Sequence, residues 1–112
     1  MGSVTPLKSQ SQPHKTTFHR RELSQILDIY GRLVMAGQAK DYGIGMYKNE
    51  AVFAIYRRHA EQPTWRVIKT PALAQAQGAY AVTGGQGQVL KRGRDLKHVL
   101  SVFESRRFEI VK

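Results

Sequence analysis

The apolar residues of this chain change their spacing once, and that change limits the folds open to it. From Arg20 to Ala36 they recur at steps of three and four residues, which is the period of an amphipathic helix. After Gly37 they alternate with polar or small residues, which is the period of a strand. A helix followed by strands predicts an α+β fold, in which helices pack on an antiparallel sheet.

Short polar or glycine-rich connections place two hairpins in the later part of the chain. One connects strands at 41–47 and 51–58, and the other connects strands at 79–83 and 88–91. We also expect a strand at 65–69, helical turns at 72–77, a helix at 95–104 capped by Asp95, and an edge strand at 108–111. The expected fold class is α+β: an antiparallel sheet of two hairpins plus additional strands, with a long N-terminal helix and a C-terminal helix packed on it.

Two glycines leave one face of the first expected strand bare. Gly43 and Gly45 point to one side, whereas Tyr42, Ile44 and Met46 point to the other. Small residues on a strand indicate that something approaches the sheet closely at that place. Either the N-terminal helix packs on this face or a ligand lies flat on it, and the sequence leaves both alternatives open.

The length of 112 residues fits one domain with one apolar core. Residues 1–15 are rich in Ser, Gln and Pro, so we expect a disordered tail there and a single α+β domain at 16–112. The chain has no cysteine, which excludes disulfides and thiolate metal sites and suits a reducing cytoplasm. No apolar run approaches the ~20 residues that cross a bilayer, so we expect a cytoplasmic protein with no membrane association.

Positive charge is in excess and is unevenly distributed. Eighteen Lys and Arg stand against eight Asp and Glu, a formal net charge of +10. Residues 1–50 hold seven basic and four acidic groups, a net +3, whereas residues 51–112 hold eleven and four, a net +7. A surplus concentrated in one half is typical of proteins that bind a polyanion, most often nucleic acid or an anionic membrane surface. The alternative is that the charge only keeps the domain in solution.

Two basic clusters carry most of the surplus. The first, Lys91-Arg92-Gly93-Arg94 with Lys97 and His98, surrounds the start of the expected final helix, where backbone amides also attract anions. The second, Arg57-Arg58-His59 with Arg66 and Lys69, lies on or near strands. Tyr56 and Trp65 adjoin it, and their rings either stack on bases or belong to the core. If the clusters share one surface, the nucleic-acid-binding residues are Lys91, Arg92, Arg94, Lys97, Arg57, Arg58 and Arg66.

The chain shows no pattern of a catalytic, cofactor or metal site. The run Gly84-Gly85-Gln86-Gly87 lacks the Gly-Lys-Ser/Thr ending of a nucleotide-binding loop, so we interpret it as a hairpin turn. His14, His19, His59 and His98 do not have the spacing of metal ligands. We therefore expect no cofactor, no metal and no enzymatic activity.

Four blocks of this sequence resemble a small family of uncharacterised bacterial proteins. The blocks are Phe18–Arg32, Ala51–Phe53 with Arg57-Arg58, Pro71–Ala74 through Gln77–Tyr80, and Leu90–Leu96. They occur in order from about Phe18 to Phe103, and on this basis the chain is similar to the alphaproteobacterial family called domain of unknown function 2794. The resemblance implies a bacterial cytoplasmic protein and supplies no catalytic residues.

These features favour a non-enzymatic protein that binds the phosphate backbone of DNA or RNA. The alternative is a protein–protein interaction module. It would be a homodimer formed through an edge strand such as 108–111, or an adaptor for an acidic protein partner.

Overall fold

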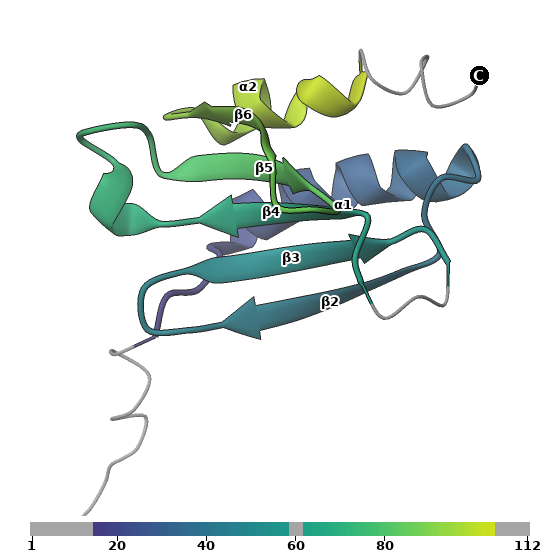
Figure 1. Ribbon diagram of the computed structural model, residues 1–112, viewed down its shortest axis with the longest axis horizontal. Helices are drawn as coiled ribbons and strands as arrows, with labels where there is room; N and C mark the ends of the chain where they lie inside the picture. The colour runs from purple at the N-terminus through teal and green to yellow at the C-terminus, as the bar shows by residue number, and fades with distance from the viewer. Residues whose placement is uncertain (1–14, 59–61, 105–112) are drawn as a thin grey trace, which may run out of the picture.

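The computed structural model describes residues 15–58 and 62–104, which form a five-stranded antiparallel sheet with helices on one face (Figure 1). The elements are α1 (Arg20–Met35), β2 (Asp41–Met46), β3 (Ala51–Tyr56), β4 (Trp65–Lys69), a 3₁₀ turn (Pro71–Leu73), β5 (Tyr80–Gly84), β6 (Val89–Gly93) and α2 (Leu96–Leu100). The strands lie in chain order, so β2 and β6 are the two edges of the sheet. This arrangement confirms the predicted α+β class, with two hairpins and a further strand between them.

α1 ends one residue before its predicted bound, and α2 is clearly shorter than the sequence pattern predicts. α1 has 16 residues, and α2 has five before a turn at Ser101, after which residues 102–104 are again helical. The Ser101 hydroxyl donates to the His98 carbonyl at 2.5 Å, so a side chain competes for the helical acceptor there. Strands begin and end within two residues of their predicted bounds. The predicted strand at 108–111 and most of the predicted tail lie outside the described residues.

The core lies between the sheet and the helices. Buried and half-buried residues alternate along β3 and β4, which is the pattern of strands covered on one face. Phe53, Val67 and Val82 are fully buried and lie side by side on neighbouring strands. α1 adds Ile26 and Leu33 from its apolar stripe, as its three- and four-residue spacing predicts.

Trp65 belongs to this core and not to a surface that stacks bases. It is 5% exposed, and its ring meets the Phe103 ring edge-on with centroids 5.5 Å apart. This contact decides between the two interpretations that the sequence leaves open for Trp65. It also attaches the segment after α2 to the sheet.

A polar cluster is buried at one end of this apolar layer. Lys69 on β4 places its Nζ 2.9 Å from Glu22 Oε1 of α1 and donates to the Thr17 carbonyl, also at 2.9 Å. The Tyr80 hydroxyl on β5 donates to the other carboxylate oxygen, and the His19 N–H donates to Oε1 at 2.8 Å. Glu22 and Lys69 are each 8% exposed. Lys69, which the sequence places in the second basic cluster, is therefore buried and paired, and that assignment is wrong.

The contacts shift the ionisation of two members of this cluster. Burial raises the pKa of Glu22, but the hydrogen bonds from Lys69, Tyr80 and the His19 backbone, together with the Lys69 charge, outweigh it and hold the pKa below the ordinary 4.5. Burial, followed by the hydrogen bond to Glu22, raises the pKa of Tyr80 to about 12. At neutral pH the cluster therefore holds an ionised Glu22 and a neutral Tyr80.

α1 packs on the side of the sheet opposite the β2 glycines. Ile44 lies across from the core residue Phe53, so the apolar side of β2 is the helix side. Gly43 and Gly45 alternate with those apolar residues and face away from the helix. The proposal that the N-terminal helix covers the glycine face is therefore wrong. The helix follows the apolar side chains of β2 and β3, because burying them is favourable.

Glu22→Gln is expected to lower the free energy of unfolding by about 3 kcal/mol, because it leaves the Lys69 ammonium buried without a carboxylate. Changing Lys69 to Met in the same chain removes that uncompensated charge, so E22Q/K69M should recover most of the loss. Urea unfolding followed by circular dichroism measures both variants. Equal stability of E22Q and the double variant would show that the ion pair does not control stability.

The same cluster predicts a dependence of stability on pH. Because the pKa of Glu22 is lowered in the folded state, the unfolded chain binds a proton more readily in acid. The stabilisation is present at neutral pH and is lost as the pH falls below 4.5. As the pH falls through this range, the urea midpoint of wild type should therefore decrease relative to that of E22Q/K69M. A difference that stays constant from neutral pH into acid would contradict this account.

Candidate functional site

The helices leave one face of the sheet uncovered, and this open face is turned toward the viewer in Figure 1. Strand register places Gly43, Ala54, Arg66 and Thr83 in one row across it. A hollow of about 380 Å³ lies over the part formed by β2, β3 and β4. We call it the glycine hollow, and its lining includes Gly43, Gly45, Tyr47, Val52, Ala54, Tyr56, Pro63 and Arg66.

The ring of Tyr47 covers one end of the glycine hollow. A Cβ atom added at Gly45 would lie 2.5 to 2.7 Å from atoms of that ring, so the ring would have to move if Gly45 had a side chain. Tyr47 is 56% exposed, which leaves much of the ring available for contact. The close approach that the glycines predict is thus made at Gly45 by the chain's own aromatic side chain.

Gly43 is bare, in contrast to Gly45. A Cβ atom added there would meet nothing within 4 Å, and its φ is not positive, so neither packing nor backbone conformation requires a glycine. Tyr56 is half-buried and lies one row away, beyond Ala54. Between Tyr47 and Tyr56 the hollow therefore has a floor of backbone and methyl groups, against which a flat group can lie.

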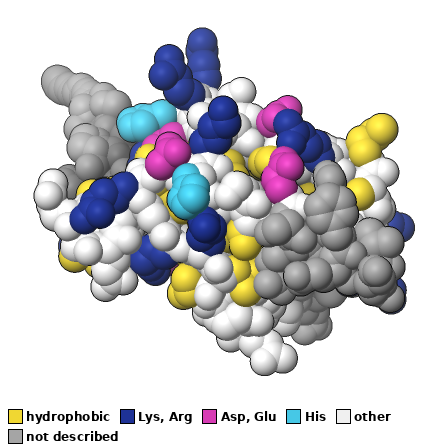
Figure 2. Space-filling model, turned by 90° about the horizontal axis from the view of Figure 1, so that it is seen from above, with side chains coloured by type: hydrophobic (Ala, Val, Ile, Leu, Met, Phe, Trp, Pro, Cys, Tyr) yellow, Lys and Arg dark blue, Asp and Glu magenta, His cyan; other side chains and the backbone are white. Residues whose placement is uncertain are grey.

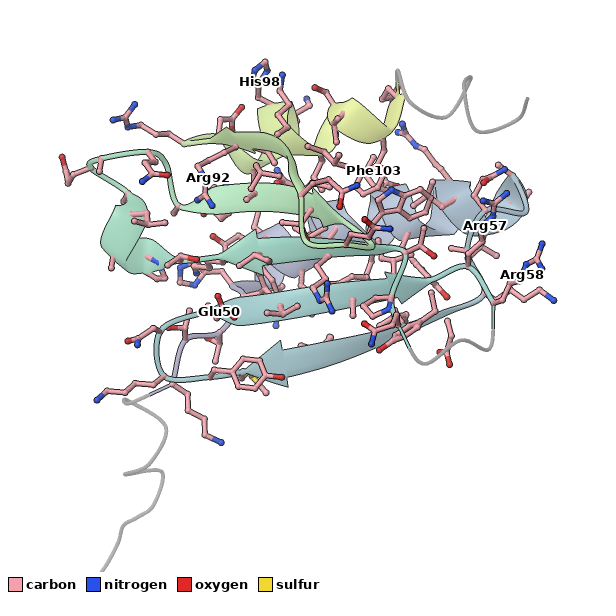
Figure 3. All side chains as sticks on the ribbon, viewed as in Figure 1. Glu50, Arg57, Arg58, Arg92, His98 and Phe103 are labelled. Atoms are coloured by element: carbon pink, nitrogen blue, oxygen red, sulfur yellow. The ribbon has the colours of Figure 1, made fainter. Side chains whose placement is uncertain are left out.

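Three arginines lie beside the glycine hollow. Arg66 is half-buried on the open face, whereas Arg57 and Arg58 are exposed just after β3 ends (Figure 3). Among the described residues none of the three takes part in a salt bridge, and their side chains make no hydrogen bond. Asp41 and Glu50 lie opposite the two tyrosines, one at each end of the hollow. Arg66 is the charged residue of the lining, and around the hollow the three arginines outnumber these two carboxylates among the described residues.

The basic cluster at the final helix does not offer the anion site that its sequence predicts. Arg94 donates from Nε to the Ala74 carbonyl at 3.1 Å and from Nη2 to the Gln75 carbonyl at 2.8 Å, so it holds a turn in place. The Asp95 carboxylate accepts the His98 N–H at 3.3 Å and caps α2. The chain's own carboxylate thus takes one of the amides that the sequence assigns to an anion.

The remaining members of that cluster point in different directions. Arg92 lies opposite Ala81 of β5 and points to the open face. Lys91 lies opposite the core residue Val82 and points to the other side. Lys97 lines a groove that also contains Asp28 and Glu104. Figure 2 views the molecule from the side of α2 and β6 and shows acidic and histidine side chains among the basic ones.

The two predicted clusters do not merge into one basic surface. Arg57 and Arg58 lie at one end of the sheet and Arg92 lies toward the other (Figure 3). Only Arg66 and Arg92 share the open face, in adjacent rows two strands apart. Residues within one cluster are neighbours along the chain, but strand parity and position along the sheet set where each side chain lies, so the expectation of a shared surface is wrong.

A second groove, of about 560 Å³, lies between α1 and α2. Arg32 lines it and already pairs with Asp28 at 3.3 Å and with Glu104 at 2.6 Å. In residues 15–58 and 62–104, this groove included, no three His, Asp or Glu side chains lie close enough together to hold a metal ion. No helix in this part of the chain has the length and apolar character to cross a bilayer. The glycine hollow therefore remains the better candidate.

Sequence reasoning missed Tyr47 as a site residue and named Tyr56 only as a neighbour of a basic cluster. The signal for Tyr47 is its spacing: it follows Gly45 by two residues, and such residues share one face of a strand. Without the register of β2 and β3, nothing places Tyr47 and Tyr56 at the two ends of one hollow.

The sequence was compared with known families, curated proteins and solved structures. Residues 16–100 match the family described as "Protein of unknown function (DUF2794)". The chain belongs to this family. No curated protein and no solved structure matches the chain. The family match includes every residue that we name in the glycine hollow, and its description gives no activity, so the case for a function rests on the geometry.

Gly43→Val should leave the free energy of unfolding within about 0.5 kcal/mol of wild type, or raise it, because a Cβ atom added at Gly43 meets nothing within 4 Å and valine favours strands. Gly78→Val is the comparison: Gly78 has a φ of 100° and lies against the Gly93 backbone, so this change should cost at least about 2 kcal/mol. Urea unfolding measures both. A large loss for Gly43→Val would show that this glycine serves the fold.

Proposed function

We propose that this protein is a non-enzymatic binder of single-stranded nucleic acid and that the glycine hollow accommodates a base. The observation that carries the proposal is the bare floor at Gly43, between the rings of Tyr47 and Tyr56. A base is a flat aromatic group, and base–aromatic stacking contributes about 1–3 kcal/mol per base. With no side chain at Gly43, a base can lie against the strand while its face or edge contacts a tyrosine.

The arginines beside the hollow would bind the phosphates that flank this base. A guanidinium group donates two parallel hydrogen bonds to a phosphate, and Arg57, Arg58 and Arg66 have no carboxylate partner among the described residues. The net charge of +10 also raises the local concentration of any polyanion. Three phosphate contacts on a single strand predict that log affinity falls against log salt with a slope of about −2.

A single strand fits this surface better than a duplex. Bases within a duplex are paired and stacked, so exposing one to a sheet costs a few kcal/mol. Stacking tolerates every base, and we therefore expect little sequence preference and binding of both DNA and RNA. We also propose a cytoplasmic location, because a chain without cysteine suits a reducing compartment.

Fluorescence anisotropy with a labelled single strand of about twelve nucleotides tests the role of the floor. Gly43→Val should weaken binding by about tenfold or more, because its side chain fills the place of the base. Gly31→Ala, an exposed helix position that also has free space around it, should bind like wild type. A duplex of the same sequence should bind more weakly than the single strand. Wild-type affinity of Gly43→Val would overturn the proposal.

A matched pair of double variants separates the site from general charge attraction. Arg57→Ala/Arg58→Ala should weaken binding and reduce the salt slope by about 1.4, because two phosphate contacts are lost. Arg20→Ala/Arg21→Ala removes the same charge from exposed positions on α1 and should leave the salt slope unchanged. Equal effects of the two pairs would indicate that only the net charge attracts nucleic acid.

A further inference from the structure

β2 is an edge strand with hydrogen-bonding groups that point away from the sheet. The Tyr47 N–H donates to the Glu50 carbonyl at 2.9 Å, so these residues form a hydrogen-bonded pair, and such pairs alternate along an antiparallel ladder. Counting back along β2, the N–H and C=O groups of Tyr42, Ile44 and Met46 point away from β3. A further strand placed beside β2 would form its hydrogen bonds with these groups.

This edge lacks the protection that edge strands usually carry. Among the described residues one outward group has a partner, because the Tyr42 N–H donates to the Asp41 carboxylate at 2.8 Å. Edge strands are usually blunted by lysine, proline or a bulge. The other edge, β6, contains Lys91 and Arg92 and has a register shift against β5. β2 has none of these features, and among the described residues Thr16 bonds only at its end, to the Tyr47 and Lys48 carbonyls, so Tyr42 to Met46 is the edge segment left open to pairing.

The side chains along β2 are apolar as well as exposed. Tyr42, Ile44 and Met46 are 41%, 41% and 47% exposed on the helix side of the sheet. α1 therefore covers this side of β2 only in part, and an apolar surface remains exposed there.

α1 extends this apolar surface beyond the strand. The Tyr30 ring meets the Tyr42 ring edge-on with centroids 4.9 Å apart, so this side of α1 faces β2. Leu27 and Val34 lie three and four residues from Tyr30 on the same side of the helix and are 36% and 42% exposed. We call the set of five exposed apolar residues the β2 flank: Leu27, Val34, Tyr42, Ile44 and Met46.

We propose that the β2 flank binds a second copy of this chain, with the two β2 strands paired antiparallel about a two-fold axis at Ile44. Ile44 of one copy then lies opposite Ile44 of the other, and Tyr42 lies opposite Met46. In this register each residue whose backbone N–H and C=O point away from β3 lies opposite another such residue. The two strands can therefore exchange hydrogen bonds along their whole length. The two five-stranded sheets become one continuous sheet.

A second copy fits this surface better than a charged partner. The β2 flank contains no charged residue in a chain with a net charge of +10, so an acidic partner would gain no ion pair from it. A two-fold axis places the apolar flank of one copy against the same flank of the other. The two flanks and the paired strand edges are buried together, and a biological interface should bury at least about 1,000 Å² in total.

The pairing also affects the open face. Gly43 of one copy lies opposite Gly45 of the other in this register, so two glycine hollows lie next to each other on one continuous surface. The dimer itself requires no nucleic acid, and its test does not depend on the proposed function.

Sedimentation equilibrium of the protein without nucleic acid tests the dimer. We expect wild type to form a dimer at micromolar concentrations and to associate more tightly at higher salt, because salt screens the repulsion between two copies of charge +10. Nucleic-acid binding should weaken with salt, so the two equilibria are distinguishable. A wild-type monomer up to about millimolar concentration would overturn the proposal.

Charge variants test the register. Ile44→Lys places two ammonium groups opposite each other and should give a folded monomer, whereas Val89→Lys, on the exposed part of β6, should remain a dimer. An equimolar mixture of Ile44→Lys and Ile44→Glu should restore a dimer through the opposite charges. A dimeric Ile44→Lys, or a monomeric mixture, would overturn the pairing at Ile44.

A covalent test covers the case in which a charge at position 44 prevents folding. The chain has no cysteine, so Ile44→Cys introduces the sole thiol. At the two-fold axis the two thiols would be close enough for a disulfide, and mild oxidation should give a cross-linked dimer that forms faster than with Val89→Cys. Equal cross-linking of the two variants would contradict the proposed interface.

Discussion

The buried contact between Glu22 and Lys69, completed by Tyr80, determines how α1 lies on the sheet. Apolar burial is not directional and allows a helix many positions on an apolar surface. A buried ammonium is different, because leaving it without a carboxylate costs several kcal/mol. Glu22 therefore has to lie over Lys69, on the side of β4 that also carries Trp65 and Val67. The apolar side chains of β2 and β3 set which face α1 covers, and the ion pair sets where on that face it lies, so the opposite face remains uncovered.

Both proposals depend on what strand parity places on the two sides of β2. The side away from α1 has the glycines, the two tyrosine rings and Arg66, which together form a hollow suited to a flat, anionic polymer. The side toward α1 has apolar residues that the helix covers only in part. Pairing of β2 with a second copy would bury those residues without covering the glycine hollow. One strand can thus serve both assembly and binding.

The fold could be predicted from the sequence because its signals are local. The change of hydrophobic period at Gly37, the hairpin connections and Asp95 as a cap each act over a few residues, and each is found in the structure. The site could not be predicted, because it depends on register and on long-range partners. Lys69 meets a carboxylate 47 residues away, and Arg94 is held by the turn after β4. A count of basic residues along the chain cannot separate these partnered cations from cations without a partner.

The most direct test of the central claim is a two-dimensional ¹H–¹⁵N NMR titration of the labelled protein with a short single-stranded oligonucleotide. If the glycine hollow binds the single strand, the amides of Gly43, Gly45 and Tyr56 and of residues next to Arg66 should show saturable shifts, while signals of α1 and of the α1–α2 groove stay in place. Shifts confined to the region of Lys91 to Lys97, or no shifts at all, would contradict the proposed site.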